Sequence, residues 1–395
     1  MTNQELMAAD KQYVMQTYGR FPVTIARGEG AKFWDCEGRE YIDFASGIGV
    51  NSLGSCHPAW IAAIEAQIHT LGHTSNLFYT EPCVKLAETL TRRTGMSNVF
   101  FANGGGEANE GMIKLARKYS FDKYGAGRSN IVTLQDSFHG RTVTTLAATG
   151  QDVFHQFFFP FTEGFRYAEP DNLDSVKAAV QDDTCAIMLE LIQGEGGVHP
   201  LDPDFVAGVK ALCEEKDLLL LVDEVQTGVG RTGHLFAFQA YGILPDVCSF
   251  AKGIAGGLPM SGIMANEKCR GVLTPGTHAT TFGANPVCAA AALAVQQTMD
   301  DAFLAAVTEK GEYLKQKIAA IGNKHLTNIR GMGLMIGVQV CGLSHSELAA
   351  KLTEAGLLVL TAGKDTLRLL PPLTITREEM DAGVEIMTKV LRDLG

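Results

Sequence analysis

The sequence has no excess of basic residues, no paired cysteines and no long apolar run. Its 33 Lys and Arg against 44 Asp and Glu give a formal net charge of −11. Nucleic acids and anionic membrane surfaces bind basic faces, so we expect neither as a partner. No apolar run approaches the roughly 18 residues of a membrane span. The N-terminal stretch also lacks the basic and apolar regions of a signal peptide.

The nine cysteines stand singly, without a Cys-x-x-Cys pair. A disulfide framework or a zinc site uses cysteines at short, regular spacings. We therefore expect free thiols, no metal site and a reducing, cytoplasmic location. A chain of 395 residues is expected to form two or three domains, at roughly 100–200 residues per domain.

Short apolar strands alternate with helices from about residue 58 to residue 285. The expected strands are 98–102, 130–134, 185–190, 218–222, 247–250 and 262–265, and the expected helices are 82–94, 107–124, 172–181 and 204–216. This alternation predicts an α/β domain whose mainly parallel sheet has helices on both faces. We expect residues 286–395 to form a smaller α+β domain and residues 1–57 to pack with it. Ligands of such sheets bind beyond the carboxyl ends of the strands.

An acid and a lysine follow two of the expected strands. Asp223 ends LLLLVD, and Lys252 follows VCSFA. A pyridine cofactor held through a Schiff base needs this pair, because the amine condenses with its aldehyde while the carboxylate keeps the ring nitrogen protonated. Taken singly, Asp223 is more typical of a helix cap and Lys252 of a solvated turn. The pairing, together with Gln226, favours the cofactor site.

Two motifs near the first strands have the composition of a ligand site. NGGGE at 103–107 opens a helix, and free N–H groups at a helix start suit a phosphate. A plain strand-to-helix turn explains the same residues equally well. In FHGRT at 138–142, Phe138 can stack on a flat heterocycle and Arg141 can clamp a carboxylate. Core packing for Phe138 and a surface ion pair for Arg141 are the alternatives.

Three later segments carry polar residues in unusual surroundings. Glu190 and Glu195 lie in ELIQGEGG, which indicates either a polar pocket wall or a solvated loop. TTFGANP at 280–286 offers hydroxyl and backbone donors to a phosphate, or a simple helix cap. Arg368 is a charge on an apolar strand, which is costly unless a carboxylate meets it. This placement favours an ion pair or a ligand contact.

Taken in order, these segments resemble the class III aminotransferases, which are pyridoxal-phosphate enzymes of fold type I. The resemblance runs from about Tyr18 to the C-terminus and includes FHGRT, QGEGG, DEVQTG, AKG, TTFGANP and RLLPPL. Within the family, the segments 18–54 and 138–151 are most similar to the acetylornithine aminotransferases. Four residues depart from the usual pattern: Ser55, Gly104, Gly106 and Leu191 stand where histidine, serine, alanine and proline are more common.

The resemblance implies a cofactor site for pyridoxal phosphate. Lys252 would be the Schiff-base lysine and proton shuttle, and Asp223 would hold the ring nitrogen. The other cofactor contacts that it implies are Gly105 and Gly106 at the phosphate, Phe138 on the ring, Gln226 at the ring hydroxyl, and Thr281 of a second subunit. Because Thr281 would come from the neighbouring chain, a homodimer with shared sites is implied.

The resemblance also implies a substrate site with two arginines. Arg141 would hold the carboxylate at the far end of the substrate, and Arg368 a carboxylate on the reacting carbon. Glu195 would cover Arg368 when the donor amine is terminal and would swing aside for glutamate, a movement that its flanking glycines would permit. The further lining residues that we expect are Tyr18, Ile48, Glu190 and Thr280.

The implied reaction is transfer of the terminal amine of N2-acetylornithine to 2-oxoglutarate. Succinylornithine, succinyldiaminopimelate, ornithine and 4-aminobutyrate are alternative donors, because the outer pocket need only fit another group. A small apolar residue at Ile48, where ornithine aminotransferases carry a tyrosine, favours an acylated amine. An aminomutase or decarboxylase on the same cofactor, and a non-catalytic scaffold, are the alternatives from other classes.

Overall fold

The computed structural model describes residues 1–394, and a seven-stranded sheet forms the centre of this part of the chain. From edge to edge its strands are β4 (Asn98–Ala102), β12 (Ser261–Ala265), β11 (Val247–Phe250), β10 (Leu219–Asp223), β7 (Thr184–Leu189), β5 (Asn130–Leu134) and β6 (Phe165–Ala168). β12 runs antiparallel to β4 and β11, and the other pairs are parallel. The expected α/β fold with a mainly parallel sheet is confirmed.

Helices cover both faces of this sheet. Leu219 and Leu221 share a buried cluster with Met112 of α5 (Gly105–Tyr124). Leu220 and Val222 belong to the other cluster, together with Val209 of α8 (Pro203–Lys216). Because successive side chains of a strand point to opposite faces, α5 and α8 lie on opposite sides. Double-sided burial explains why the strand reads as an unbroken apolar run.

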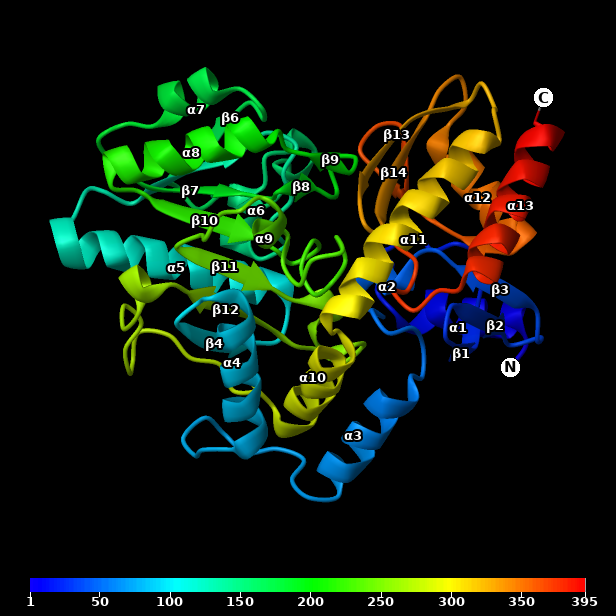
Figure 1. The fold of residues 1–395 in the computed structure, drawn as a ribbon, viewed down its shortest axis with the longest axis horizontal. Helices are drawn as coiled ribbons and strands as arrows, with labels where there is room; N and C mark the ends of the chain where they lie inside the picture. Colours follow the sequence, from blue (N-terminus) through cyan, green and yellow to red (C-terminus); the bar gives the residue numbers. More distant parts are fainter. Residues whose placement is uncertain (395) are drawn as a thin grey trace.

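The N-terminal strands join the C-terminal part of the chain. β1 (Ile25–Glu29), β2 (Lys32–Asp35) and β3 (Glu40–Asp43) form a sheet that β15 (Leu357–Leu358) completes beside β3. Next to it lies a second sheet in the order β13 (Leu326–Met332), β14 (Met335–Val340), β17 (Thr366–Leu369) and β16 (Leu360–Ala362). In Figure 1 the N-terminus lies beside β1 and β2, and α11 (Asp301–Ala320), α12 (His345–Ala355) and α13 (Arg377–Asp393) lie on the same side of the molecule.

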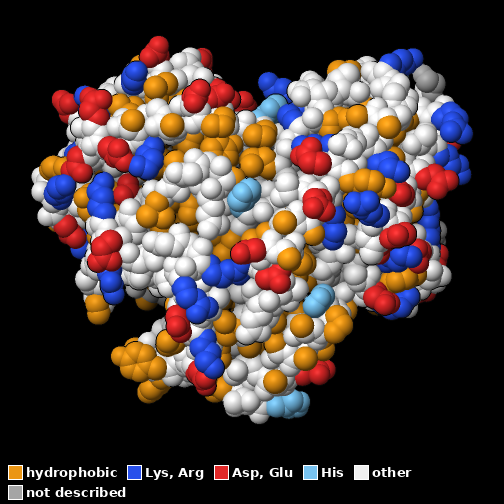
Figure 2. All heavy atoms as spheres, in the orientation of Figure 1, with side chains coloured by type: hydrophobic (Ala, Val, Ile, Leu, Met, Phe, Trp, Pro, Cys, Tyr) orange, Lys and Arg blue, Asp and Glu red, His pale blue; other side chains and the backbone are white. Residues whose placement is uncertain are grey.

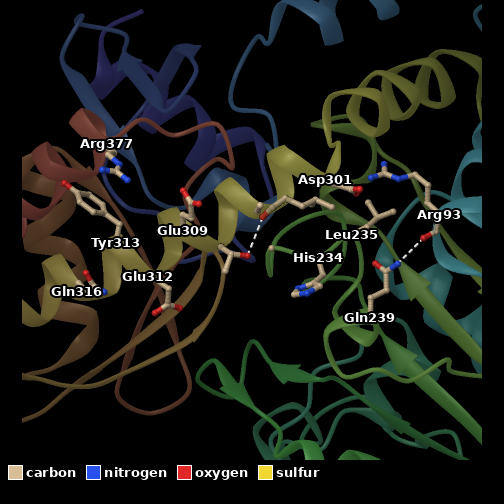
Figure 3. A pocket seen from close by; sticks show the side chains of 14 residues that line it. Arg93, His234, Leu235, Gln239, Asp301, Glu309, Glu312, Tyr313, Gln316 and Arg377 are labelled. Carbon is tan, nitrogen blue, oxygen red and sulfur yellow. Dashed lines mark hydrogen bonds between the residues drawn. The ribbon is translucent and has the colours of Figure 1, made fainter.

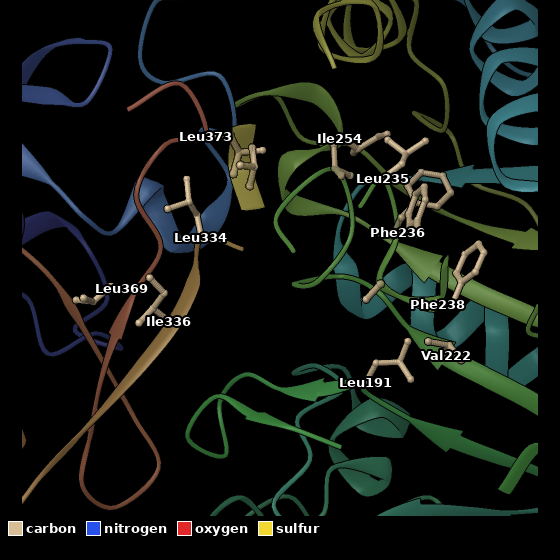
Figure 4. Close-up of a cluster of buried hydrophobic side chains, with 14 of the residues drawn as sticks. Leu191, Val222, Leu235, Phe236, Phe238, Ile254, Leu334, Ile336, Leu369 and Leu373 are labelled. Atoms are coloured by element: carbon tan, nitrogen blue, oxygen red, sulfur yellow. The ribbon is translucent and has the colours of Figure 1, made fainter. Parts of the chain in front are cut away.

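The two parts share one hydrophobic cluster. Figure 4 shows Phe236 and Phe238 of the large sheet region together with Ile336 and Leu369 of the C-terminal sheet, and all four are buried in this cluster. The buried guanidinium of Arg231 crosses the same boundary and donates from Nη1 to the carbonyls of Leu334 (3.0 Å) and Pro371 (2.6 Å). Apolar packing and these bonds hold the parts together.

The division of the chain at residues 57 and 285 stays a prediction. α10 (Pro286–Thr298) packs against α3 (Pro58–Ile68) and α4 (Glu81–Thr94), and these helices lie together at the bottom of Figure 1. This packing argues for a second boundary after α10 instead of before it.

Several local expectations differ from the structure. The sequence also predicts a first helix over residues 5–17, but α1 (Asn3–Tyr13) ends four residues earlier, because Val14 adopts extended backbone. β6 was not expected, and its burial is partial, as befits a short edge strand with little apolar periodicity. β12 is antiparallel to its neighbours β4 and β11, so its carboxyl end lies at the edge of the sheet opposite to the one where the parallel strands end.

Acidic and basic side chains are interspersed over the face in Figure 2. Among residues 1–394, no helix has the length and apolar character to cross a membrane, and no group of three or more His, Cys, Asp or Glu is placed to hold a metal ion.

The contact between α11 and the turn before β14 predicts a stability effect. A Cβ atom on Gly311 would lie 2.1 Å from the carbonyl oxygen of Gly333. We expect Gly311→Ala to lower the free energy of unfolding by about 1–3 kcal/mol, because the turn must move to admit the methyl group. Gly19→Ala is the matched control, since a Cβ there meets nothing within 4 Å. Equal thermal midpoints for the two variants would contradict this packing.

Candidate active site

A cavity of about 670 Å³ opens beyond the carboxyl ends of β10 and β11. It brings together predicted residues from five separate segments of the chain. Those that line it are Gly105, Gly106, Phe138, Arg141, Glu190, Asp223, Gln226 and Lys252. In particular, Asp223 and Lys252 face one cavity, as the paired motifs require.

A second hollow is larger but has different chemistry. It measures about 1090 Å³ and lies between α11 and residues 233–239 (Figure 3). Among its titratable side chains, His234, Asp301 and Glu309 are exposed. None of the site residues predicted from the sequence lines it. The smaller cavity is therefore the candidate active site.

Asp223 is buried at the end of β10 and accepts four hydrogen bonds or close polar contacts. Its Oδ2 lies 2.7 Å from Asn109 Nδ2 and 2.8 Å from His139 Nδ1, and its Oδ1 accepts from the N–H of Val225 (3.0 Å) and from Ser249 Oγ (3.3 Å). Burial acts to raise the pKa of Asp223, but the hydrogen bond and charge of His139 lower it below its usual value. The group is an anion that suits a cationic ring N–H.

Lys252 follows β11 at the start of the short helix η2 (Lys252–Ala255). Its backbone is left-handed, with φ 47°, a conformation that costs energy in any residue but glycine. Burial lowers the pKa of the Lys252 amine, against the opposing effect of Glu195. A lowered pKa makes more of the neutral, nucleophilic amine available for condensation with an aldehyde.

The first turn of α5 can hold a phosphate. Glu107 Oε2 accepts the N–H groups of Asn103 (2.8 Å) and Gly104 (3.4 Å). The N–H groups of Gly105 and Gly106 have no acceptor within the helix, and both residues line the cavity. A Cβ on Gly105 would lie 2.8 Å from Val225 Cγ1, so the loop after β10 requires glycine there.

Arg368 on β17 is buried and forms an ion pair beside the cavity with the half-buried Glu195. Its Nη1 donates to Glu195 Oε1 (2.5 Å) and to Gln226 Oε1 (2.9 Å), whereas its Nε is buried without a partner in the described chain. Glu195 is therefore the carboxylate that was expected beside this charge. Gln226 connects the pair to the loop that follows Asp223.

The glycines around Glu195 are packed tightly. A Cβ on Gly194 would lie 2.5 Å from Gln226 Nε2, and one on Gly196 would lie 2.6 Å from the Asp136 carbonyl oxygen. The Glu195 carbonyl accepts the N–H of Gly363 at 2.8 Å. Each of these glycines therefore admits a close neighbour, which is a second reason for glycine here besides the movement expected from the sequence. Rotation of the Glu195 side chain remains the movement open to it.

Glu190 connects the two loops that carry Phe138 and Glu195. Its Oε2 accepts the N–H of Phe138 (3.0 Å) and its Oε1 that of Gly194 (3.3 Å). Burial raises the pKa of Glu190 to about 7. Glu190 therefore lines the cavity and also holds together the two loops that form its wall.

Besides Glu195 and Arg368, which form the ion pair beside the cavity, four expected residues lie outside its lining as the described chain forms it. Tyr18 and Ile48 are exposed by 71% and 44%. Thr280 Oγ1 accepts from Asn103 Nδ2 at 3.2 Å, and Thr281 is exposed. Their proposed roles must therefore come from the mouth of the site or from a second chain.

Sequence reasoning missed Asn109 and did not foresee the contact of His139 with Asp223. His139 is buried, lines the cavity and places its Nδ1 2.8 Å from Asp223 Oδ2. Asn109 is buried one turn after Gly105, and its Nδ2 also donates to the His139 carbonyl at 2.7 Å. A polar residue on the inner side of a helix is the signal that could have identified Asn109.

The comparisons with known proteins decide the family. Residues 13–391 match the family model described as aminotransferase class III. The chain is a class III aminotransferase. This confirms the resemblance drawn from the motifs, and the enzymes of this family use pyridoxal phosphate.

Three relatives illustrate the similarity. The chain is 48% identical over 396 residues to the acetylornithine aminotransferase of Haemophilus ducreyi, with all of both chains covered (100% of each). A solved N-acetylornithine aminotransferase from Stenotrophomonas maltophilia is 34% identical, with a TM-score of 0.85 and coverage of 98% of this chain and 99% of that one. A solved ornithine aminotransferase from Toxoplasma gondii, in which PLP partly occupies the active site, is 32% identical to this chain. Its TM-score is 0.95, and the match covers 99% of this chain and 94% of that one.

The acid next to Asp223 predicts a pH effect on stability. Glu224 is buried and accepts hydrogen bonds from Thr227 Oγ1 and from the N–H groups of Ala237 (3.0 Å) and Phe238 (2.7 Å). Burial raises its pKa from 4.5 to about 7, and the charge of Asp223 adds to this effect. The folded state therefore favours the protonated acid, and its contribution to stability is lost as pH rises from the unfolded to the folded pKa.

We expect Glu224→Gln, which cannot ionise, to escape this loss. The free energy of unfolding of the variant, relative to the parent, should rise by about 3 kcal/mol between pH 4.5 and pH 8. Urea unfolding of both proteins at several pH values measures the difference, in which other titrating groups cancel. A difference that does not change with pH would show that the Glu224 pKa is not raised in the folded protein.

Proposed function

We propose that this aminotransferase moves the terminal amine of N2-acetylornithine to 2-oxoglutarate, giving N-acetylglutamate 5-semialdehyde and glutamate. The carrying observation is one cavity with Asp223 and Lys252 at its inner end, Arg141 in its wall and the Arg368–Glu195 pair beside it. The acetylornithine aminotransferases among the relatives support the same assignment.

The cofactor of the proposal is pyridoxal phosphate. The chemistry supplied by the bound cofactor is electron withdrawal from the carbon that loses its proton. Lys252 would hold the cofactor and then move that proton with its amine. Asp223 would keep the ring nitrogen protonated, and Phe138 would pack on the ring. Gln226 would contact the ring hydroxyl, and the first-turn N–H groups of Gly105 and Gly106 would bind the phosphate.

The Arg368–Glu195 pair lets one cavity accept two unlike substrates. The reacting carbon of acetylornithine carries no carboxylate, so Glu195 would stay on Arg368 and avoid an unpaired buried cation. The α-carboxylate of glutamate would take Arg368 and displace the Glu195 side chain. In both cases Arg141 would hold the carboxylate at the far end, and Glu190 would fix the wall between them.

The outer pocket favours an acylated amine. Ile48 and Tyr18 would line its mouth, and Ile48 offers a small apolar surface instead of a polar contact for a free amine. Succinylornithine, succinyldiaminopimelate, ornithine and 4-aminobutyrate are the other donors that this cavity could serve.

The proposal includes a homodimer with shared sites. Thr281 is exposed in its own chain and would reach the phosphate in the partner, with Thr280 near the substrate. The neighbouring segments expose large apolar side chains: Leu77 by 87%, Tyr79 by 100% and Phe282 by 59%. Asn76 Nδ2 ties these segments together by donating to the Gly283 carbonyl at 2.9 Å. Exposed apolar groups gathered in this way favour an interface.

A rate panel and a spectrum test the proposed function. We expect the purified protein to show a visible absorbance band that glutamate shifts and that Lys252→Ala abolishes, because this amine would hold the cofactor. The exposed Lys177→Ala, whose side chain is 54% accessible, is the control. With 2-oxoglutarate as acceptor, acetylornithine should give a higher kcat/KM than succinylornithine, ornithine or 4-aminobutyrate. Faster turnover of another donor would refute the substrate assignment, and turnover without 2-oxoglutarate would refute the reaction.

The ion pair predicts unequal effects on the two half-reactions. Glu195→Gln should slow the single-turnover reaction with acetylornithine about tenfold more than that with glutamate, a difference of about 1.4 kcal/mol. The reason is that a neutral amide leaves Arg368 uncompensated when the substrate brings no carboxylate. Glu215→Gln, at an accessible helix position, is the control. Equal losses in both half-reactions would rule out the covering role of Glu195.

A further inference from the structure

The guanidinium of Arg141 rests on aromatic rings at the cavity wall. Its Cζ lies 4.3 Å from the ring centroid of Phe154 and 5.6 Å from that of Phe138. The two rings meet edge to face, with centroids 5.8 Å apart and an interplanar angle of 67°. Arg141 itself is exposed, whereas Phe154 is half-buried. The cation is thus held by rings on one side and open to solvent on the other.

Phe154 can hold a fixed position because its segment is tied to the loop that carries Phe138. Phe154 ends the short helix η1 (Asp152–Phe154). Just before it, the N–H of Gly150 donates to Ser137 Oγ (3.0 Å), and Gln151 Nε2 donates to the Ser137 carbonyl (2.9 Å). A Cβ on Gly150 would lie 2.0 Å from the Leu134 carbonyl oxygen, so the two segments approach as closely as backbones allow.

The other side of Phe154 is also anchored. His155 Nε2 lies 2.9 Å from the carbonyl oxygen of Leu146 in α6 (Val143–Ala148), the helix that begins directly after Arg141 and Thr142. The ring of His155 packs edge-on against Phe161, with centroids 5.3 Å apart. Phe154 therefore belongs to the same rigid unit as the backbone of Arg141.

We propose that Phe154 is a positioning residue for the far carboxylate of the substrate, acting by holding the Arg141 guanidinium. This inference rests on the proposed function, in which Arg141 binds that carboxylate. A guanidinium that rests on a ring keeps its in-plane N–H groups free for a bidentate contact. An arginine held in this orientation before binding loses less side-chain entropy when the carboxylate arrives.

The role makes Phe154 specific for one part of the substrate. Loss of the Phe154 ring should weaken the binding of ligands that carry the far carboxylate and should not change the binding of ligands that lack it. A matched pair of amines separates the two cases, because N-acetyl-1,4-diaminobutane is N2-acetylornithine without its carboxylate.

The test compares Phe154→Leu, which removes the aromatic face, with Phe154→Tyr, which keeps it. For Phe154→Leu we expect KM for acetylornithine to rise about two- to fivefold, with kcat unchanged and KM for N-acetyl-1,4-diaminobutane unchanged. Phe154→Tyr, which keeps the aromatic ring, should have the same KM as the parent. Calorimetric titration with glutarate, an unreactive dicarboxylate, should show the same fold-change in Kd. Phe158→Leu, 61% exposed in the same segment, is the control and should match the parent.

Arg141→Gln separates failure of the inference from failure of the proposed function. If Arg141→Gln weakens the binding of glutarate and Phe154→Leu does not, the positioning role of Phe154 is wrong and the role of Arg141 stands. If Arg141→Gln leaves glutarate binding unchanged, the carboxylate contact of the proposed function is itself wrong. Equal changes for both amines with Phe154→Leu would indicate general damage to the loop and overturn the inference, as would tighter binding of glutarate.

Discussion

The candidate active site depends on one carboxylate that stays ionised while buried. Removing Asp223 from water favours its neutral form, yet contacts from Asn109, His139, Val225 and Ser249 reverse that preference. These partners come from α5, from the loop after β5, from the residues beyond β10 and from β11. Only a sheet that brings these segments to one edge can surround a single carboxylate in this way. The central sheet is therefore the structural condition for the charge at the inner end of the cavity.

At the other end of the site, the positive charge of Arg368 is compensated in a similar way. Arg368 is held among apolar strands by Glu195 and Gln226, and Gln226 belongs to the loop that begins at Asp223. The two halves of the site are thereby linked through one amide side chain. The tight glycines around Glu195 add to this order, since they bring backbone within contact of Gln226 and Asp136. The site is built from close packing, and the proposed exchange of carboxylates on Arg368 requires rotation of only one side chain.

Sequence reasoning was most successful where chemistry and secondary structure coincide. Asp223, Lys252, Gly105 and Arg141 each follow a strand, so their meeting at one edge followed from the direction of a parallel sheet. β12 was placed in the sheet correctly, but its reversal was not foreseen, because a short apolar run does not encode its direction. Asn109 was missed for a related reason. Its place on the inner side of α5 could have marked it as a buried polar residue, but its contact with Asp223 joins distant segments and cannot be read from the local sequence.

The pairing of β3 with β15 has a consequence for the order in which the protein is assembled. β3 lies among the first residues to leave the ribosome, whereas β15 lies near the end of the chain. The edge of β3 therefore stays unpaired until almost the whole polypeptide has been synthesised, because contacts of such sequence separation close late. During translation the edge of β3 therefore stays exposed. An exposed strand edge can form hydrogen bonds with another nascent chain, which leads to aggregation.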